Sequence, residues 1–400
     1  MIGMGGGWGI WIDRFSLGIW TGKRDHSDTG TRECQTHQLL DHRQKSRCEK
    51  NGKRGFYSHI CVSEVPRLCD FCVIRDDEDC KDIDSEQGTG LACYIGPMSD
   101  KSMEGLPQQT IRTPVSCEGI GLHSGRSVSL RLFPAEADSG IRFRVRAEAS
   151  GFDEIEARID LVRETSFATT IGRGSQFVQT VEHLLAAASG LRIDNLLVEL
   201  DAPEVPILDG SARPFAELLA HAGVRRQPAP RTAWSVTKSF TVRDETGWIE
   251  ATPAPRLEVE NTVDYDHPAI GRQTFTYTDD GPETFLEELA GARTFGFLED
   301  IDRLKAAGLI KGGSLDNALV IGPDGVLNPG GFRWSDECVR HKVLDLLGDL
   351  SLLGKPLNGR IRAFKAGHTL HAKFVTYLAA HPEVRLLQTI HATEPVSAIA

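Results

Sequence analysis

The feature that most constrains the fold of this chain is a change in sequence character near residue 105. Residues 1–105 show no sustained period of 2 or 3.6, but polar clusters such as RDDEDCKDIDSEQGTG. We therefore predict that this extension is disordered. From residue 108 onward, short apolar and alternating runs are separated by Gly, Pro and Asp, as expected for a series of strands and helices. The folded part should begin near residue 106.

The cysteines follow the same division. Seven of the nine precede residue 100, and only Cys117 and Cys338 lie beyond it. An alternative for the extension is a zinc site made by Cys69, Cys72, Cys80 and Cys93, with His59 nearby. A structural zinc site normally has a second closely spaced pair of ligands, which this pattern lacks. Because only Cys117 and Cys338 lie in the predicted folded part, we expect a reduced, cytoplasmic protein.

Charge and hydropathy exclude two classes of partner. A formal net charge of -11 argues against a nucleic acid or an anionic membrane surface as the main partner. No apolar run approaches the ~20 residues that span a bilayer, so an integral membrane protein is not expected. The apolar first twenty residues contain Asp13 and Arg14 and open without a basic residue, so no signal peptide is predicted. Translation starting at Met98 or Met103 is an alternative, which mass spectrometry of the native protein would test.

Beyond residue 105 the same succession of patterns occurs twice. Strand-like runs occupy residues 127–135, 141–147 and 194–200. The run TVEHLLAAASG predicts a helix with Thr180 as its N-cap and Gly190 as its stop. The run RRQPAPR has the composition of a linker, and strands are predicted again in AWSVTKSFTVRD, WIEATPA and RLEVENTVDY. We therefore predict an α+β protein with a first domain at 106–230 and a second at 231–400.

The run RHKVLDLLGD places a histidine, a lysine and two aspartates in a leucine-rich helix that should begin at Ser335 and extend to residue 352. At about 100° per residue, the leucines occupy one side of this helix. The opposite side carries His341, Lys342, Asp345 and Asp349. This stripe could be a solvated face, in which a His/Asp pair one turn apart stabilises the helix by a few tenths of a kcal/mol. Alternatively, His341 and Asp345 chelate a metal.

A catalytic zinc needs a third protein ligand and an open position. His183 is a candidate, because Glu182 precedes it at a helix start and one short element could then offer both a ligand and a base. Taken alone, a Glu-His pair also fits a surface position. His368 follows a glycine in FKAGHTLHAKF and is another candidate. The remaining histidines of the predicted folded part are His123, His221, His267, His371, His381 and His391.

Several long segments together are far more specific than any one of them. They are GIGLHSGR (119–126), TVEHLLAAASGLRIDNLLVELDAPEVPILDGSARPF (180–215), GARTFGFLEDIDRLKAAGLIKGGSLDNALVI (291–321), RHKVLDLLGDL (340–350) and AFKAGHTLHAKFV (363–375). In this order and spacing the sequence resembles the UDP-3-O-acyl-N-acetylglucosamine deacetylases, zinc amidases that perform the first committed step of lipid A synthesis in Gram-negative bacteria. The resemblance covers residues 108 to about 395.

The resemblance implies a metal site. Its ligands would be His183, His341 and Asp345, with Zn²⁺ as the metal and Fe²⁺ as an alternative for a site of two histidines and one aspartate. The resemblance also implies that Glu182 is the general base and His368 the general acid.

Further roles are implied for residues around the metal. Thr294 would help to hold the oxyanion, and Asp349 would orient and charge the general acid. Lys342 and His123 would lie near the substrate, and Phe295 at the mouth of a passage for the acyl chain.

The implied fold has two domains, each with a layer of helices on a β-sheet. The helical layers face each other with the active site between them, and residues 291–321 are expected to form a βαβ insert in the second domain. The implied substrate is UDP-3-O-acyl-N-acetylglucosamine, and a monomer is expected. Rival hypotheses are a zinc-binding adaptor protein and a hydrolase of another N-acyl sugar. A two-carboxylate glycosidase is less attractive, because every carboxylate pair here also offers metal ligands.

Overall fold

The computed structural model of the chain describes residues 19–22, 57–60, 105–145 and 154–391. The chain divides into two compact units, Met1–Cys93 and Tyr94–Ala400. Within the first unit, β1 (Ile19–Gly22) pairs antiparallel with β2 (Tyr57–Ile60). Apart from these strands, the predicted disorder of residues 1–105 and the alternative four-cysteine zinc site lie outside the described residues.

The second unit contains mixed helices and sheets, as the α+β prediction requires. One sheet has five strands in the order β4-β5-β11-β6-β7. These strands are β4 (Val115–Ile120), β5 (Ser127–Pro134), β6 (Ile141–Val145), β7 (Glu154–Glu156) and β11 (Leu196–Leu200). In β5, Val128, Leu130 and Leu132 are fully buried and alternate with more exposed residues. The three strand predictions in this region are confirmed, with slightly shorter bounds.

A second sheet has seven strands, with β14-β15-β21-β13-β22 in order and β16 joining β17 to β21. The strands are β13 (Thr232–Val236), β14 (Phe240–Arg243), β15 (Trp248–Thr252), β16 (Leu257–Asp264), β17 (Arg272–Thr278), β21 (Leu357–Phe364) and β22 (Arg385–Thr389). The strands predicted in AWSVTKSFTVRD, WIEATPA and RLEVENTVDY are therefore confirmed.

The expected linker is a strand. β12 (Val224–Pro230) covers most of RRQPAPR and pairs antiparallel with β3 (Pro107–Ile111). The pairing is irregular between Arg226 and Pro230. β12 tolerates proline because it is an edge strand of a two-stranded sheet, where a missing N–H on the open side breaks no ladder. The linker prediction was wrong, and the proposed domain boundary at residue 230 stays a prediction.

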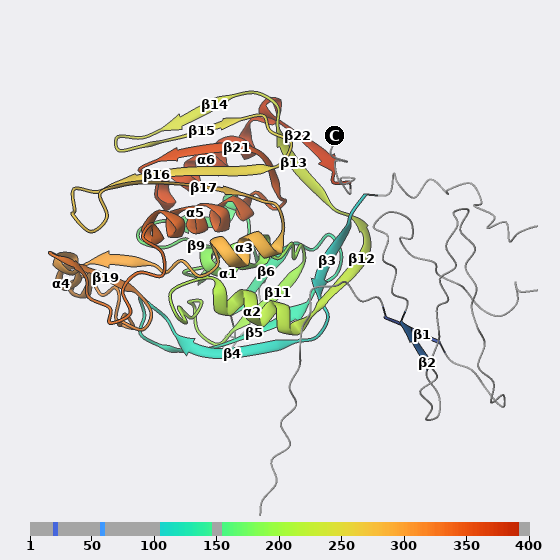
Figure 1. Cartoon of the computed structure of the whole chain (residues 1–400), viewed down its shortest axis with the longest axis horizontal. Helices are drawn as coiled ribbons and strands as arrows, with labels where there is room; N and C mark the ends of the chain where they lie inside the picture. Colours follow the sequence, from blue (N-terminus) through green and yellow to red (C-terminus); the bar gives the residue numbers. More distant parts are fainter. Residues whose placement is uncertain (1–18, 23–56, 61–104, 146–153, 392–400) are drawn as a thin grey trace, which may run out of the picture. The chain divides into compact units, whose positions relative to one another are not determined.

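Six α-helices accompany the sheets among the described residues. They are α1 (Glu182–Gly190), α2 (Arg213–Ala222), α3 (Pro282–Glu288), α4 (Leu298–Ala306), α5 (Glu337–Leu350) and α6 (His368–Ala380). Figure 1 shows α1 and α5 side by side between the five-stranded and seven-stranded sheets. One buried apolar cluster connects these layers through Leu130 of β5, Leu184 of α1, Leu346 of α5 and Phe374 of α6.

The expected start of α5 was one residue early. Its N-cap is Asp336 rather than Ser335, and no side chain caps it. The Asp336 carboxylate instead accepts a hydrogen bond from Arg340 at 2.7 Å. No helix among the described residues is long and apolar enough to cross a membrane.

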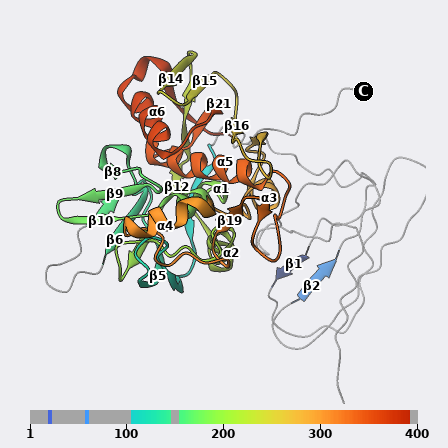
Figure 2. The same cartoon turned by 90° about the vertical axis from the view of Figure 1, so that its left-hand side faces the viewer.

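Two smaller sheets flank the larger ones. One contains β8 (Val162–Glu164), β9 (Thr170–Arg173) and β10 (Gln176–Val178), and Figure 2 shows it beside β6 and below α6. The other contains β18 (Phe295–Phe297), β19 (Leu319–Gly322) and β20 (Gly325–Val326). Because β18 and β19 are parallel and α4 lies between them in the chain, this segment is a βαβ unit.

The α1–α5 contact depends on a glycine. A Cβ atom added at Gly348 would lie 2.1 Å from the carbonyl oxygen of Glu182, so any side chain there would force the helices apart. We expect Gly348→Ala to lower the free energy of unfolding by about 1–3 kcal/mol, the usual cost of overpacking. Urea denaturation would measure this. Gly330→Ala is the matched control, because a Cβ there meets nothing within 4 Å. Equal stabilities of the two variants would contradict the prediction.

Candidate metal centre and active site

Three residues of α1 and α5 form a buried cluster with metal-binding side chains. His183 is the second residue of α1, and His341 and Asp345 lie one turn apart on α5. Oδ1 of Asp345 is 3.2 Å from Nε2 of His341 and 3.6 Å from Nε2 of His183. The three side chains are at most 4% exposed. The solvated-face hypothesis for α5 was therefore wrong, because the stripe faces α1 instead of water.

The hydrogen bonds of this cluster use the outer atoms of its side chains and leave the metal-binding atoms facing the cluster. Nδ1 of His341 donates to the carbonyl oxygen of Ala292 at 3.0 Å, which leaves the Nε2 lone pair facing the cluster. Oδ2 of Asp345 accepts from Lys342 at 2.6 Å, whereas its Oδ1 is buried without a hydrogen-bond partner. A buried carboxylate oxygen of this kind is costly unless it has a ligand. Two imidazole nitrogens and a carboxylate oxygen, whose ligand atoms lie within 4.8 Å of one another, fit a zinc ion.

The protonation states also suit metal binding. Burial lowers the pKa of His341 to about 3, against the opposing effect of Asp345. Burial alone would raise the pKa of Asp345, but His341 and Lys342 hold it well below its usual value. Histidine binds metals in its neutral form and aspartate in its ionised form, so these states need no change before binding.

Glu182 lies beside the cluster as the first residue of α1. Its Oε2 atom accepts a hydrogen bond from the backbone N–H of Thr169 at 3.1 Å. Burial raises its pKa, while His368 and His183 oppose that rise. A buried carboxylate with a raised pKa next to a metal ligand is suited to accepting a proton.

His368 is the first residue of α6 and pairs with Asp349. Its Nδ1 atom lies 2.8 Å from Oδ2 of Asp349, and its Nε2 atom lies 3.8 Å from Oδ2 of Asp345. Burial alone would lower its pKa, but Asp349 and Asp345 raise it to about 9. The second ring nitrogen thus faces the metal cluster and carries a proton at neutral pH. A protonated imidazole in this position can donate to a departing amine.

Lys342, which follows the ligand candidate His341, and Phe295, the first residue of β18, lie next to the cluster. The ring centroids of Phe295 and His341 are 6.3 Å apart, and Nζ of Lys342 is 5.8 Å from the Phe295 ring. The backbone N–H of Thr294 donates to the carbonyl oxygen of Gly210 at 2.8 Å. Gly210 has a φ of 83°, and a Cβ there would lie 2.2 Å from a backbone oxygen. The loop at Gly210 therefore sets the position of Thr294 and of β18, which begins at the next residue, Phe295.

A buried carboxylate positions the loop that contains His123. Glu204 accepts the backbone N–H groups of His123 and Ser124, each at 2.8 Å. The hydroxyl of Thr180 also donates to Glu204, at 3.3 Å, and Thr180 has a φ of 61°. The prediction of Thr180 as a helix N-cap was wrong. The N-cap is Val181, and the Thr180 hydroxyl donates to Glu204 instead. Burial lowers the pKa of His123, Glu204 opposes this shift, and His368 adds to it.

Comparison with known proteins identifies the family of the chain. A family described as UDP-3-O-acyl N-acetylglycosamine deacetylase matches residues 108–380 of the chain. The chain belongs to this deacetylase family. The resemblance found in the sequence is thereby confirmed.

Curated relatives of this deacetylase-family chain are named UDP-3-O-acyl-N-acetylglucosamine deacetylase. The one from Oleidesulfovibrio alaskensis is 46% identical over 281 residues, which are 70% of this chain and 92% of the relative. The one from Myxococcus xanthus is 47% identical over 275 residues, which are 69% of this chain and 87% of the relative. The one from an Anaeromyxobacter species is 48% identical over 275 residues, which are 69% of this chain and 89% of the relative.

The ten site residues predicted for this family member are not equally well connected. Ion pairs and ring contacts join most of them directly: His183, His341, Asp345, Lys342, Phe295, His368 and Asp349. Glu182 is joined through its chain neighbour His183. Thr294 is placed through its chain neighbour Phe295, and His123 through the effect of His368 on its pKa.

Two further residues of the site were not predicted. Nδ1 of the fully buried His371 lies 2.8 Å from Oδ2 of Asp349, the atom that also contacts His368. The hydroxyl of Thr169 donates to the other oxygen, Oδ1, at 2.6 Å. Spacing could have found His371, which lies three residues after His368 on one helix face. Nothing in the run SFATT distinguishes Thr169.

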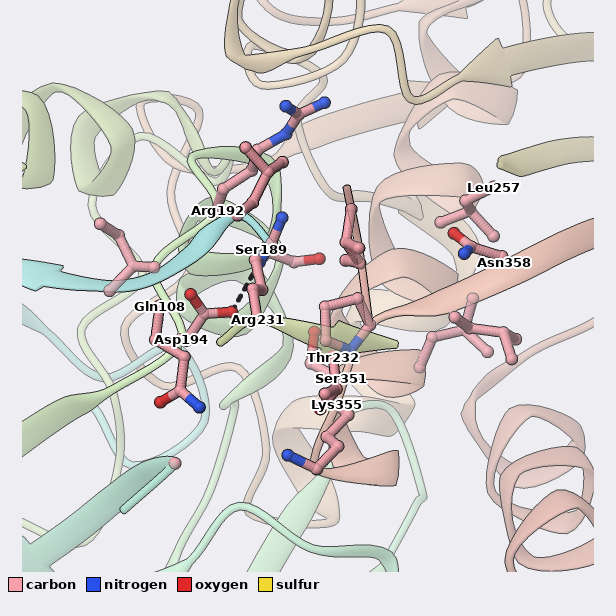
Figure 3. Close-up of a pocket in the computed structure, with 18 of the residues that line it drawn as sticks. Gln108, Ser189, Arg192, Asp194, Arg231, Thr232, Leu257, Ser351, Lys355 and Asn358 are labelled. Carbon is pink, nitrogen blue, oxygen red and sulfur yellow. Dashed lines mark hydrogen bonds and ion pairs between the residues drawn. The ribbon is translucent and has the colours of Figure 1, made fainter. Parts of the chain in front are cut away.

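A separate cavity of about 1210 Å³ contains none of the predicted site residues in its lining. It lies where β3, β13 and the end of α5 meet, and Figure 3 shows its labelled side chains. Arg231 pairs with Asp194 at 2.7 Å, and Arg192 with Asp279 at 3.5 Å. These paired charges compensate each other, which fits a structural role.

Proposed function

We propose that the chain hydrolyses the N-acetyl group of UDP-3-O-acyl-N-acetylglucosamine, releasing acetate and UDP-3-O-acyl-glucosamine, in the committed step of lipid A synthesis. The observation that carries this proposal is the buried donor set on α1 and α5, with Glu182 on one element beside it and His368 on another. The names of the curated relatives support the same reaction.

The metal of this proposal is Zn²⁺, held by His183, His341 and Asp345, with Fe²⁺ as the alternative ion. When bound, the ion lowers the pKa of a water molecule and polarises the acetamide carbonyl group. The unpartnered Oδ1 atom of Asp345 supports the assignment.

The protein's own groups move the protons. Glu182 accepts the proton of the attacking water, and its raised pKa suits it to do so. His368 donates a proton to the departing amine, and Asp349 orients its ring and keeps it charged. The hydroxyl of Thr294 donates a hydrogen bond to the developing oxyanion.

The substrate meets groups at the edge of the cluster. Lys342 and His123 contact polar parts of the substrate, and Phe295 stands at the mouth of the acyl passage formed by the βαβ unit. The exposed Leu298 and Leu315 of this unit support an apolar passage. The general acid, base and metal ligands all come from one chain, so the proposed site needs no second copy, and the proposal is of a monomer. Cys117 and Cys338 are free, which supports action in the cytoplasm.

The site lies between two domains in this proposal. Residues 106–230 contribute the five-stranded sheet with α1 and α2, and residues 231–391 contribute the seven-stranded sheet with α5 and α6. The contact between α1 and α5 supports helical layers that face each other.

Acetate release from the purified chain tests the reaction. We expect release from UDP-3-O-acyl-N-acetylglucosamine, its loss after chelation, and its recovery on adding Zn²⁺. UDP-N-acetylglucosamine is the matched control, and it should react far more slowly because it lacks the acyl chain. No release from the zinc-loaded chain would exclude the deacetylase, and undiminished release after complete metal removal would exclude a metalloenzyme. Equal rates on both substrates would favour a hydrolase of other N-acyl sugars.

A further inference from the structure

Thr169 contacts both halves of the proposed acid–base machinery. This residue directly precedes β9 and is 1% exposed. Its backbone N–H donates to Oε2 of Glu182 at 3.1 Å, and its hydroxyl donates to Oδ1 of Asp349 at 2.6 Å. Its carbonyl oxygen accepts from the backbone N–H of Val181, the N-cap residue of α1. One residue thus joins the start of α1 to the last turn of α5.

The hydroxyl contact limits how the Asp349 carboxylate can turn. Oδ2 of Asp349 contacts Nδ1 of both His368 and His371, each at 2.8 Å, and the Thr169 hydroxyl oxygen lies 3.3 Å from the same Nδ1 atom of His368. With Oδ1 held by the Thr169 hydroxyl, rotation about the bond to the carboxylate would break contacts at both oxygens. The carboxylate therefore keeps Oδ2 directed at His368, which fixes the ring that faces the metal cluster. Hydrogen bonds to an ionised acceptor are shorter and stronger than neutral ones.

The backbone contact acts in the same way on Glu182. A main-chain N–H at the start of a strand is held by the sheet and has little freedom to move. The bond to Oε2 therefore restrains one carboxylate oxygen of Glu182, independently of the Thr169 side chain. Because the two contacts use different atoms, a side-chain substitution can remove one and leave the other.

We propose that Thr169 is a positioning residue for the deacetylation. Its hydroxyl holds Asp349, and through it the general acid His368. Its backbone N–H restrains the general base Glu182, so the acid and the base keep their relative positions. This inference rests on the proposed function. The competing explanation is that the hydroxyl merely satisfies its own need for an acceptor in a buried place.

Two substitutions separate the hydroxyl from the shape of the side chain. Thr169→Val keeps the shape and removes the hydroxyl, whereas Thr169→Ser keeps the hydroxyl and removes a methyl group. We expect Thr169→Val to lower kcat by about tenfold or more. This loss is smaller than the 10²–10⁴-fold rate enhancement that a positioned acid contributes, because the acid itself remains. KM and zinc content should stay near those of the unchanged chain. Thr169→Ser should retain most of kcat.

A double-mutant cycle with His368→Ala provides the decisive readout. If the hydroxyl acts through His368, Thr169→Val should have almost no further effect on the residual rate of the His368→Ala chain. Thr170→Val is the matched control, because none of the described contacts joins the neighbouring Thr170 to a site residue, and it should leave kcat unchanged.

Three results would overturn the inference. They are an unchanged kcat in Thr169→Val, an equal loss in both backgrounds of the cycle, and a loss of kcat that follows a loss of zinc. Failure of the proposed function would look different, because the unchanged chain itself would then release no acetate.

Discussion

Replacing Asp345 by alanine should remove most of the bound metal and, with it, the deacetylase activity. The substitution deletes one of three ligands and leaves the ammonium group of Lys342 without the carboxylate that lies 2.6 Å from it. Loss of a residue that only hydrogen-bonds to a metal ligand already lowers metal affinity by about 10–100-fold, so loss of a ligand itself should lower it more. Zinc content by atomic absorption and kcat/KM for acetate release would measure both effects.

Two further variants test whether the loss of metal is specific to the Asp345 carboxylate. Asp345→Asn keeps the size of the side chain and should also lose most of the metal, because its amide is a poorer ligand than a carboxylate. Asp336→Ala is the matched control on the same helix, since it breaks only a partly exposed pair with Arg340. Such pairs contribute about 0.3–0.5 kcal/mol, so metal and activity should be retained. Full zinc content in Asp345→Ala would show that the ligand assignment is wrong.

Replacing His368 by alanine should lower turnover while leaving zinc nearly intact. A positioned general acid contributes about 10²–10⁴-fold to the rate, and His368 is not one of the three ligands proposed here, which are His183, His341 and Asp345. We therefore expect kcat to fall within that range. Zinc content and kcat measured on one preparation distinguish this variant from Asp345→Ala. His221→Ala is the control, because His221 is exposed at the end of α2.

The pH profile gives the same assignment an independent check. The pKa of His368 is raised to about 9, so the acid is protonated at neutral pH and loses its proton as pH rises through that value. Glu182 must be ionised, and its raised pKa places the acidic limb above the usual range of a glutamate. The unchanged chain should give a bell-shaped profile, and His368→Ala should lose the alkaline limb. Loss of zinc in His368→Ala would contradict the acid assignment.

Local patterns predicted the strands well but not the linker. β5 and β16 alternate buried and more exposed residues, a signal that needs no knowledge of the rest of the fold. RRQPAPR carries no such alternation, and it is a strand because β3, more than a hundred residues earlier, pairs with it. A strand stabilised by a distant partner leaves little trace in its own composition.

The N-cap predictions failed for a related reason. Ser335 and Thr180 both have side chains that favour helix starts. The hydroxyl of Thr180 instead donates to Glu204, which holds the loop of His123, and α5 begins after Asp336. Tertiary partners therefore decided how these polar side chains are used.

The sequence by itself determined the family, the α+β class and the one-sided stripe of α5, because motif order and helical periodicity are properties of the chain alone. Whether that stripe met water or another helix could not be decided from it. Tertiary structure decided this, since the approach of α1 at Gly348 buries His341 and Asp345 and directs them at His183. It also brought in Thr169, whose backbone N–H is chemically the same in every residue except proline and becomes specific only through its position.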